Sequence, residues 1–333
     1  MTPRRYLGVD AGGTSTRSAL IDARGRVLAR GTAGGANHHT TDPAAVRASV
    51  REAIRAALGA RHHEPTAAAP DDSFRVAAVG IGWSGLEAPG DEADARAIVG
   101  DSVDAPVMVL DSDVVAAHLG AFTGRPGVLV AAGTGSIVLG VDADGHRVRV
   151  GGWGHRYGDE GSAAWIATEG IRAALQGADG RGPATALWEA LLEHAGLVAD
   201  PAKSFKATAH ALTAWLYHPS RHLNDVATFA QRLHAASIAG DAVATTVLRR
   251  AGVELARQVA AAVRRLGPPA DVAVAGTGGV WEQAATVREG CREALAQLLA
   301  DVDVRWVPAA ADPAVGAAYM AVLADGQALP EGA

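Results

Sequence analysis

The sequence YLGVDAGGTSTRSALI, residues 6–21, contains the pattern that indicates the fold. An apolar run ends at Asp10, small residues follow at 11–14, and a second run with alternating polar and apolar positions starts at Ser15. This order predicts a β-hairpin with a glycine-rich tip. The same order occurs again at 127–141, where the turn at 133–136 reads GTGS. A repeated order of elements predicts two lobes of related structure.

Strand and helix patterns alternate along the rest of the chain. We expect strands at 26–31, 74–81, 107–110, around Val148, at 272–275 and at 302–307, and helices at 44–58, 91–99, 114–122, 282–299 and 315–323. The alternation predicts an α/β fold with a cleft between two lobes. The N-terminal lobe is expected to contain residues 1–117 and the last helix, 312–326, and the larger C-terminal lobe residues 118–311, with a helical insertion at 162–267. The tail from Asp325 is expected to be frayed.

Composition excludes several classes of protein. A chain of 333 residues that is 49% hydrophobic can bury a large core. Its formal charge of -6 comes without a long basic block, so nucleic acid is not an expected partner. The single cysteine, Cys291, excludes an intramolecular disulfide and a metal site made only of one chain's cysteines. Because the N-terminus becomes polar too early for a signal sequence or a membrane span, we expect a cytoplasmic protein with no membrane partner.

Both glycine–threonine turns are suited to phosphate binding, since the exposed N–H groups of a tight turn attract anions and hydroxyl groups add donors. The P-loop pattern GxxxxGK[ST] is absent, and the two lysines, Lys203 and Lys206, lie far from both turns in sequence. Glycine turns also connect strands in many proteins that bind nothing there. Two such turns, with Asp10 at the end of a strand, favour a nucleotide held between paired hairpins.

Phosphoryl transfer also needs Mg²⁺ and a carboxylate that accepts the proton of the nucleophile. Asp10 is placed to orient the metal ion, most simply through water. Asp111 and Asp113 both follow the strand at 107–110, and either could be the base. We expect one of the two to cap the helix that follows.

The loop at 151–162, GGWGHRYGDEGS, has five glycines and two adjacent carboxylates ahead of an apolar helical run. One interpretation is a capped helix start with Ser162 as the N-cap residue. The other is a ligand-binding loop, because dense glycine allows a close approach of the backbone to another group.

Taken together, these motifs resemble the N-acetylglucosamine kinase and BadF/BadG/BcrA/BcrD-type ATPase family, in the sugar kinase and actin-like ATPase superfamily. The resemblance spans most of the chain and includes GANH (35–38), WSG (83–85), GTGG (276–279) and DPAVGA (312–317). It implies two ribonuclease H-like lobes, ATP and Mg²⁺ as cofactors, and transfer of the γ-phosphoryl group to the 6-hydroxyl of N-acetylglucosamine or glucosamine. We also expect a homodimer.

The resemblance assigns roles by position. It places the catalytic aspartate on Asp113, since a small residue, Gly120, follows seven positions later. ATP and its metal ion are assigned to Asp10, Gly12, Gly13, Thr14, Thr134, Gly135, Gly276, Gly278 and Gly279. The aminosugar is assigned to Asn37, His38, Ser84, Gly85, Asp113, Thr134, Gly135, Ser136, Gly152, Trp153 and Asp159.

Two positions depart from the animal N-acetylglucosamine kinases. His39 stands where those enzymes have tryptophan, and Ile137 where they have asparagine. Both lie near the expected pocket for the 2-substituent, so glucosamine and muramic-acid-type sugars stay open as substrates.

Two other functions are weighed against the kinase. An ATPase activator of a radical dehydratase or reductase would need cysteine pairs that Cys291 alone cannot supply. A non-catalytic sensor of sugar and nucleotide would not need both Asp10 and Asp113. A regulator of the ROK family is disfavoured, because the zinc pattern CxCGxxGC is absent.

Overall fold

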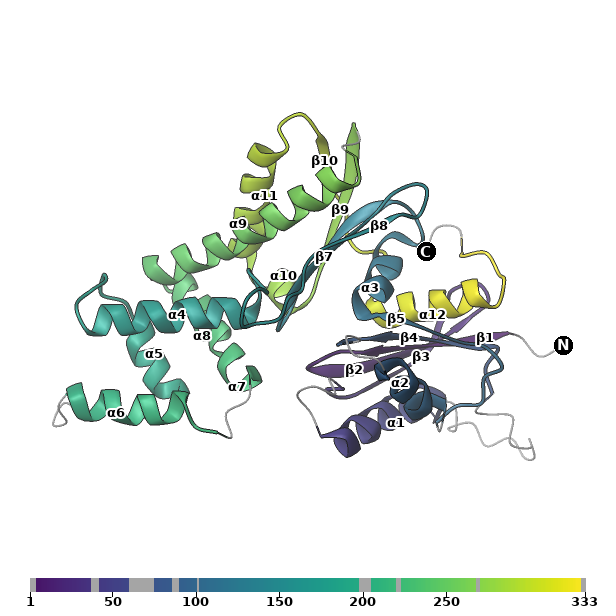
Figure 1. Ribbon diagram of the computed structural model, residues 1–333, viewed down its shortest axis with the longest axis horizontal. Helices are drawn as coiled ribbons and strands as arrows, with labels where there is room; N and C mark the ends of the chain where they lie inside the picture. Colours follow the sequence, from purple (N-terminus) through teal and green to yellow (C-terminus); the bar gives the residue numbers. More distant parts are fainter. Residues whose placement is uncertain are drawn as a thin grey trace.

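The computed structural model describes residues 4–36, 42–59, 75–85, 90–100, 102–197, 205–219, 223–267 and 270–330. They form two five-stranded mixed sheets, which is the α/β fold expected from the sequence (Figure 1). The first sheet has the order β3-β2-β1-β4-β5 and consists of β1 (Arg5–Ala11), β2 (Ser15–Asp22), β3 (Val27–Gly34), β4 (Ala78–Trp83) and β5 (Met108–Ser112). The second has the order β10-β9-β6-β7-β8 and consists of β6 (Gly127–Ala132), β7 (Ser136–Val141), β8 (Arg147–Gly151), β9 (Asp271–Thr277) and β10 (Asp303–Trp306).

The two sheets share one topology. In the first, β1, β2 and β3 form an antiparallel meander, and β4 and β5 continue the sheet in parallel on the other side of β1. In the second, β6, β7 and β8 form the meander, and β9 and β10 continue it in parallel on the other side of β6. The repeat predicted from the two glycine–threonine turns is therefore confirmed as a repeat of topology.

Helices cover both faces of the first sheet. They are α1 (Pro43–Gly59), α2 (Asp91–Gly100), α3 (Asp113–Phe122) and α12 (Pro313–Ala324). Because successive residues of a strand face opposite sides, Leu7 and Val9 pack in one core with α1 and α2, whereas Tyr6 packs in another with α12. Figure 1 shows the yellow α12 lying across the purple strands, although the two are at opposite ends of the chain.

The contact of α12 with the first sheet and with α3 is a contact between backbones. A β-carbon at Gly8 would collide with the carbonyl oxygen of Ala314, and one at Gly80 with that of Ala317. Likewise, a β-carbon at Gly316 would collide with the carbonyl oxygen of Ala116 on α3. Glycine is therefore required at these positions by the close approach of the main chains. The predicted lobe boundary at 117/118 divides α3, and both lobe limits stay predictions.

The remaining helices belong to the second half of the chain. They are α4 (Ala163–Ala178), α5 (Leu187–His194), α6 (Phe205–Leu216), α7 (Leu223–Ala227), α8 (Phe229–Ile238), α9 (Ala242–Arg265), α10 (Gly279–Gln283) and α11 (Ala285–Leu298). The long helix α9 packs against α11 and against β6, β7 and β8, and α4 to α8 form a helical extension beside it (Figure 1). Within the described residues, we find no helix with the length and apolar character that crossing a membrane would require.

Two predictions about the C-terminal part were wrong. The helix expected at 282–299 is divided at Ala284, which has extended backbone angles (φ -95°, ψ 91°). The tail is not frayed up to residue 330: Tyr6 Oη donates to Asp325 Oδ2 at 2.9 Å, and Arg4 pairs with Asp325 at 3.2 Å. The fully buried Tyr6 ring needs a partner for its hydroxyl group, and the tail supplies it.

Candidate functional site

The turn after β1 and the turn after β6 meet where the two sheets approach each other. Thr14 Oγ1 and Thr134 Oγ1 lie 2.8 Å apart and share a hydrogen bond, although they are 120 positions apart in the sequence. We call this place the junction: the turns at 11–14 and 133–136 together with Asp10 and Asp113. The structure thus brings both predicted phosphate elements into contact.

The first turn is supported by the end of β3. The N–H of Gly12 closes the turn by donating to the carbonyl oxygen of Ser15 at 3.1 Å, and the N–H of Ala36 donates to that of Gly12 at 3.0 Å. Gly35 leaves no space for a side chain, because a β-carbon there would collide with the carbonyl oxygen of Gly13. Backbone contacts alone therefore fix the position of this turn.

Ser84 and Gly85 follow β4, the parallel neighbour of β1. Both the N–H and the hydroxyl group of Ser84 donate to the carbonyl oxygen of Ala11 at 3.0 Å, so its oxygen remains an acceptor beside the first turn. Gly85 has a positive φ of 81°. Asn37 and His38, the other predicted sugar ligands in the first half, lie outside the described residues.

The second turn is supported by the start of α4. The N–H groups of Ala163 and Ala164 donate to the carbonyl oxygens of Gly133 and Thr134 at 2.9 and 3.2 Å. Ser136 Oγ donates to the carbonyl oxygen of Glu160 at 2.9 Å. These helix N–H groups, which often bind anions, are used here to hold the turn. An anion at this place would have to be bound by the turn itself.

The glycine loop at 151–162 contains the helix cap that its sequence predicts. Ser162 is the N-cap residue of α4, and its Oγ accepts a hydrogen bond from the N–H of Trp165 at 3.1 Å. Asp159, only 8% exposed, lies against the second turn, where a β-carbon at Gly135 would be 2.9 Å from its Oδ2. Burial raises the pKa of Asp159, while hydrogen bonds from the backbone of Ser136 and Gly154 lower it.

The other end of this loop lies open. Gly151 and Gly152 have positive φ values of 74° and 69°, and the Trp153 side chain that follows is 80% exposed. A large apolar ring outside the core is free to cover a ligand. The expected helix cap is therefore confirmed, and a sugar-facing role of Gly152 and Trp153 stays a prediction.

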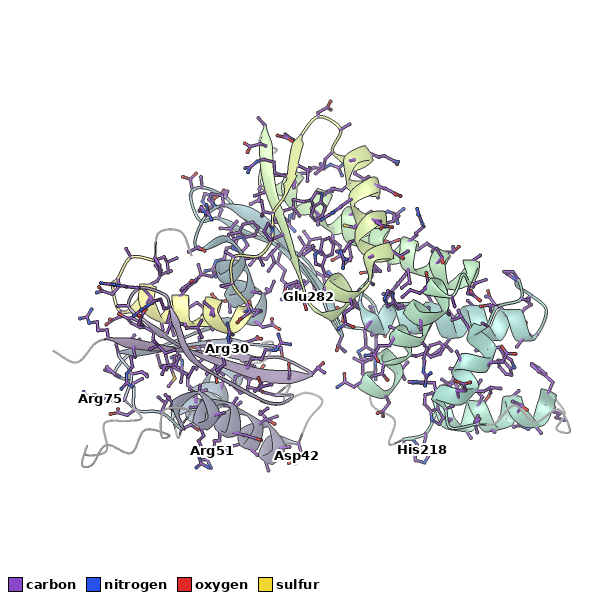
Figure 2. All side chains as sticks on the ribbon, turned by 180° about the vertical axis from the view of Figure 1, so that it is seen from behind. Arg30, Asp42, Arg51, Arg75, His218 and Glu282 are labelled. Carbon is purple, nitrogen blue, oxygen red and sulfur yellow. The ribbon has the colours of Figure 1, made fainter. Side chains whose placement is uncertain are left out.

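The predicted adenosine turn lies against the second glycine–threonine turn. Gly278 has a φ of 96°, and a β-carbon there would lie 2.5 Å from the carbonyl oxygen of Ala132, at the end of β6. A side chain at Gly276 would collide with the Trp281 ring, and Gly279 starts α10. Glu282 Oε1 accepts from the N–H of Gly278 at 3.3 Å; Figure 2 labels Glu282 near the middle of the molecule.

Asp10 and Asp113 interact electrostatically across the junction. Burial raises the pKa of Asp10 to about 7, with a further contribution from the negative charge of Asp113, while Arg17 lowers it and Asp312 raises it. Burial also raises the pKa of Asp113, opposed by a hydrogen bond from the N–H of Val114 and by the charge of Arg149. Two neighbouring carboxyl groups whose pKa values are both raised are typical of a functional site.

Asp111 and Asp113 have different environments. Asp111 Oδ2 forms an ion pair with Arg147 Nη1 of β8 at 2.6 Å, whereas Asp113 forms none among the described residues. Asp113 is the first residue of α3, and its Oδ1 accepts from the N–H of Val114 at 2.7 Å. The N-cap residue is Ser112, with no side-chain cap bond, so the prediction that one aspartate caps this helix was wrong. Asp111 is paired with Arg147 of the second sheet. Asp113 lies one residue after the N-cap position, inside the helix.

Carboxylate oxygens are the donors that Mg²⁺ prefers, and a divalent ion would offset the repulsion between Asp10 and Asp113. Among the described residues, the acidic and histidine side chains that lie close enough together to bind one metal ion are Asp142, Asp144 and His146. They lie on the exposed turn between β7 and β8, away from the residues of the junction. The junction does not provide a complete set of protein ligands. The residues present therefore fit an ion that Asp10 would hold through water and that would take most of its ligands from water and phosphates.

Two residues that sequence reasoning missed hold the glycine loop. Gln258 of α9 is 8% exposed, and its Nε2 donates to the carbonyl oxygen of Glu160 at 2.9 Å. Arg149 Nη2 donates to the carbonyl oxygen of Gly152 at 2.5 Å. A glutamine among the apolar positions of the helical pattern at 242–265 was a visible signal for Gln258. Nothing in the local sequence distinguishes Arg149 from Arg147.

Comparison with known proteins gives one consistent family. The model of the BadF/BadG/BcrA/BcrD ATPase family matches residues 7–321. The chain is 25% identical to an N-acetyl-D-glucosamine kinase of Dictyostelium discoideum, covering 97% of this chain and 99% of that protein. It is 28% identical to an N-acetylmuramic acid/N-acetylglucosamine kinase of Clostridium acetobutylicum, covering 78% and 79%. A solved structure from Chromobacterium violaceum, described as a "putative N-acetylglucosamine kinase", aligns with a TM-score of 0.70 at 28% identity, covering 96% and 99%.

The two sheets of equal topology agree with the two-lobed fold of sugar kinases and actin-like ATPases. The family match extends through both sheets and into α12. The chain is therefore a member of the BadF/BadG/BcrA/BcrD ATPase family.

Proposed function

We propose that this protein is an ATP-dependent aminosugar kinase that transfers the γ-phosphoryl group to the 6-hydroxyl of N-acetylglucosamine or glucosamine. The observation that carries the proposal is the junction, where two glycine–threonine turns in contact lie beside the coupled pair Asp10 and Asp113. The names of the relatives, kinases of N-acetylglucosamine and N-acetylmuramic acid, support a sugar with a 2-acetamido group as the acceptor.

Asp113 is the proposed base. One carboxylate oxygen is held by the N–H of Val114, which leaves the other to accept the proton of the sugar hydroxyl. Burial raises the pKa of Asp113 and makes it a better proton acceptor than an ordinary aspartate. The transition state of phosphoryl transfer is loose, so correct placement of Asp113 contributes more than its basicity.

The two turns are proposed to hold the phosphates. Thr14 and Thr134 would exchange their mutual hydrogen bond for bonds to phosphate oxygens, and the N–H groups of Gly12, Gly13 and Gly135 would add further donors. Asp10 would hold Mg²⁺ through water, and the ion would neutralise phosphate charge when bound. The turn with Gly276, Gly278 and Gly279 would receive the adenosine.

The sugar is proposed to lie between the two halves of the site. Ser84 and Gly85 would contact it from the first sheet, and Ser136, Gly152, Trp153 and Asp159 from the second. Asp159 is already placed by the second turn, so its carboxylate can accept from sugar hydroxyls without rearrangement. Asn37 and His38 complete the proposed set.

The decisive experiment measures ADP release with ATP, Mg²⁺ and a panel of sugars: glucosamine, N-acetylglucosamine, N-acetylmuramic acid, N-acetylmannosamine and glucose. Asp113→Asn is expected to reduce kcat by a factor of about 1,000 or more, while sugar affinity stays within a few-fold. Asp111→Asn is the matched control, because Asp111 follows the same strand but is paired with Arg147. Equal losses in the two variants would refute the assignment of the base, and no turnover on any of these sugars would refute the kinase.

A further inference from the structure

Strand β8 carries two arginines, Arg147 and Arg149, that lie on one face of the second sheet because alternate residues of a strand share a face. Arg149 pairs in register with Leu139 of the antiparallel neighbour β7, and directly opposite residues also share a face. Leu139 packs in a core cluster with Val114 of α3. Arg149 therefore lies on the face that is turned towards α3, the helix that begins with Asp113.

The partners of the two arginines differ. Arg147 is neutralised by its ion pair with Asp111 at 2.6 Å. Arg149 donates from Nη2 to the carbonyl oxygen of Gly152 at 2.5 Å and, within the described residues, has no acidic partner in an ion pair. A guanidinium group has five N–H donors, so most of those of Arg149 remain available. Its charge acts on Asp113, whose pKa it lowers.

The backbone around Arg149 is arranged to place this group. The carbonyl oxygen of Arg149 accepts from Arg265 Nη1 of α9 at 2.9 Å. A β-carbon at Gly152 would lie 3.0 Å from Arg149 Nη2 and 2.8 Å from Ile137 Cδ1, so a residue with a side chain would displace the guanidinium group. With Gly152 in a left-handed conformation (φ 69°), its carbonyl oxygen receives the hydrogen bond from Arg149.

The proposed reaction develops negative charge that a cation near Asp113 would stabilise. In the transfer, the bond between O6 and the γ-phosphorus forms, the bond to the β,γ-bridging oxygen breaks, Asp113 takes the hydroxyl proton, and ADP leaves with the electron pair. Negative charge on the oxygens of the transferred group must be stabilised throughout. Many phosphoryl-transfer enzymes use a lysine, but Lys206 lies on α6 and Lys203 is the chain's only other lysine.

We propose that Arg149 is a catalytic residue that donates hydrogen bonds to the transferred phosphoryl group, opposite Asp113. This inference rests on the proposed kinase function. Arg149 thereby connects two parts of the site: one donor fixes Gly152 of the sugar-facing loop, and the others reach the reacting phosphate.

The test compares Arg149→Gln with Arg147→Gln in the full chain, using steady-state kinetics with the best sugar of the panel. Arg149→Gln is expected to lower kcat by a factor of about 100 or more, with the KM values for ATP and sugar within a few-fold. Arg147→Gln is expected to keep kcat within a few-fold. Added guanidinium ion at millimolar concentration should restore part of the turnover of Arg149→Ala, which loss of a structural contact alone would not produce.

Each outcome has a clear meaning. If Arg149→Gln keeps its kcat, or changes only the KM for sugar, Arg149 is a binding residue and the inference is overturned while the kinase stands. If the wild-type protein itself has no turnover on any sugar, the proposed function fails first. Unchanged thermal unfolding of Arg149→Gln would show that a loss of kcat does not come from misfolding.

Discussion

The two glycine–threonine turns occupy equivalent places in two sheets of equal topology, yet they are held in different ways. The turn at 11–14 is held by the main chain at the end of β3 and by Ser84 after β4. The turn at 133–136 is held by the first N–H groups of α4 and lies against the Asp159 carboxylate. A repeated scaffold therefore has two kinds of support, and the second places a candidate phosphate turn against Asp159 of the candidate sugar loop.

The first prediction concerns the charged end of the first turn. Asp10→Asn is expected to reduce kcat by about 100-fold or more, because the Mg²⁺ proposed to bind there would lose its anchor. It is also expected to stabilise the protein at pH 8. Burial raises the pKa of Asp10 to about 7, so the native state keeps a proton that the unfolded state loses, and the free energy of unfolding falls as pH rises from about 4 to 7.

The measurement is chemical unfolding at pH 5 and pH 8 without Mg²⁺. The gain in stability of Asp10→Asn over the wild type should be larger at pH 8 than at pH 5 by roughly 3 kcal/mol. Asp111→Asn, outside the coupled pair, serves as the control. An equal gain in stability at both pH values would show that the pKa of Asp10 is not raised in the native state.

The second prediction compares glycines of the second turn. Gly135→Ala places a methyl group 2.9 Å from Asp159 Oδ2, whereas Gly133→Ala meets nothing within 4 Å. Gly135→Ala should cost about 1–3 kcal/mol of stability and raise the KM for the sugar, because it displaces Asp159. Gly133→Ala should resemble the wild type in thermal unfolding and kinetics. If Gly135→Ala and Gly133→Ala behave alike, the position of Asp159 does not depend on the second turn.

The third prediction applies the same change at Gly35, which packs against the first turn. Gly35→Ala meets the backbone carbonyl of Gly13, which cannot rotate away as a carboxylate can. Its expected effect is a raised KM for ATP with little change in the KM for sugar, the reverse of Gly135→Ala. Steady-state kinetics, with ATP and sugar each varied at a saturating concentration of the other, measure the two KM values. If both variants impair the same substrate, the two turns do not have separate roles.

The smallest effects are expected from contacts between the two halves. Thr14→Val and Thr134→Val each remove one partner of an exposed hydrogen bond, and a double-mutant cycle should give a coupling energy of about 1 kcal/mol or less in unfolding. Arg147→Gln breaks an exposed ion pair and should cost less than about 1 kcal/mol. A larger coupling between the threonines would mean that the halves are held together there even without nucleotide.

The sequence predicted most elements and the repeat, because hydrophobic period and glycine turns are local signals. Ser162 as an N-cap residue also follows from neighbouring residues. The hydrogen bond between Thr14 and Thr134, the ion pair of Asp111 and the packing of the tail against Tyr6 join segments that are far apart in the chain. No local pattern encodes which of two aspartates the other sheet will pair with. The resemblance assigns the base to Asp113, and the ion pair of Asp111 with Arg147 agrees with this assignment, which stays a prediction.

The position of α12 has a consequence for how the protein is made. The strands of the first sheet leave the ribosome early, but α12, which covers one face of that sheet through Gly8 and Gly80, is translated only after all strands of the second sheet. Until then, that apolar face lacks the cover of α12. The first sheet can therefore complete its packing only after the second sheet has been synthesised, and a chain truncated before residue 312 should be retained by chaperones or degraded even though every strand of the two sheets is present.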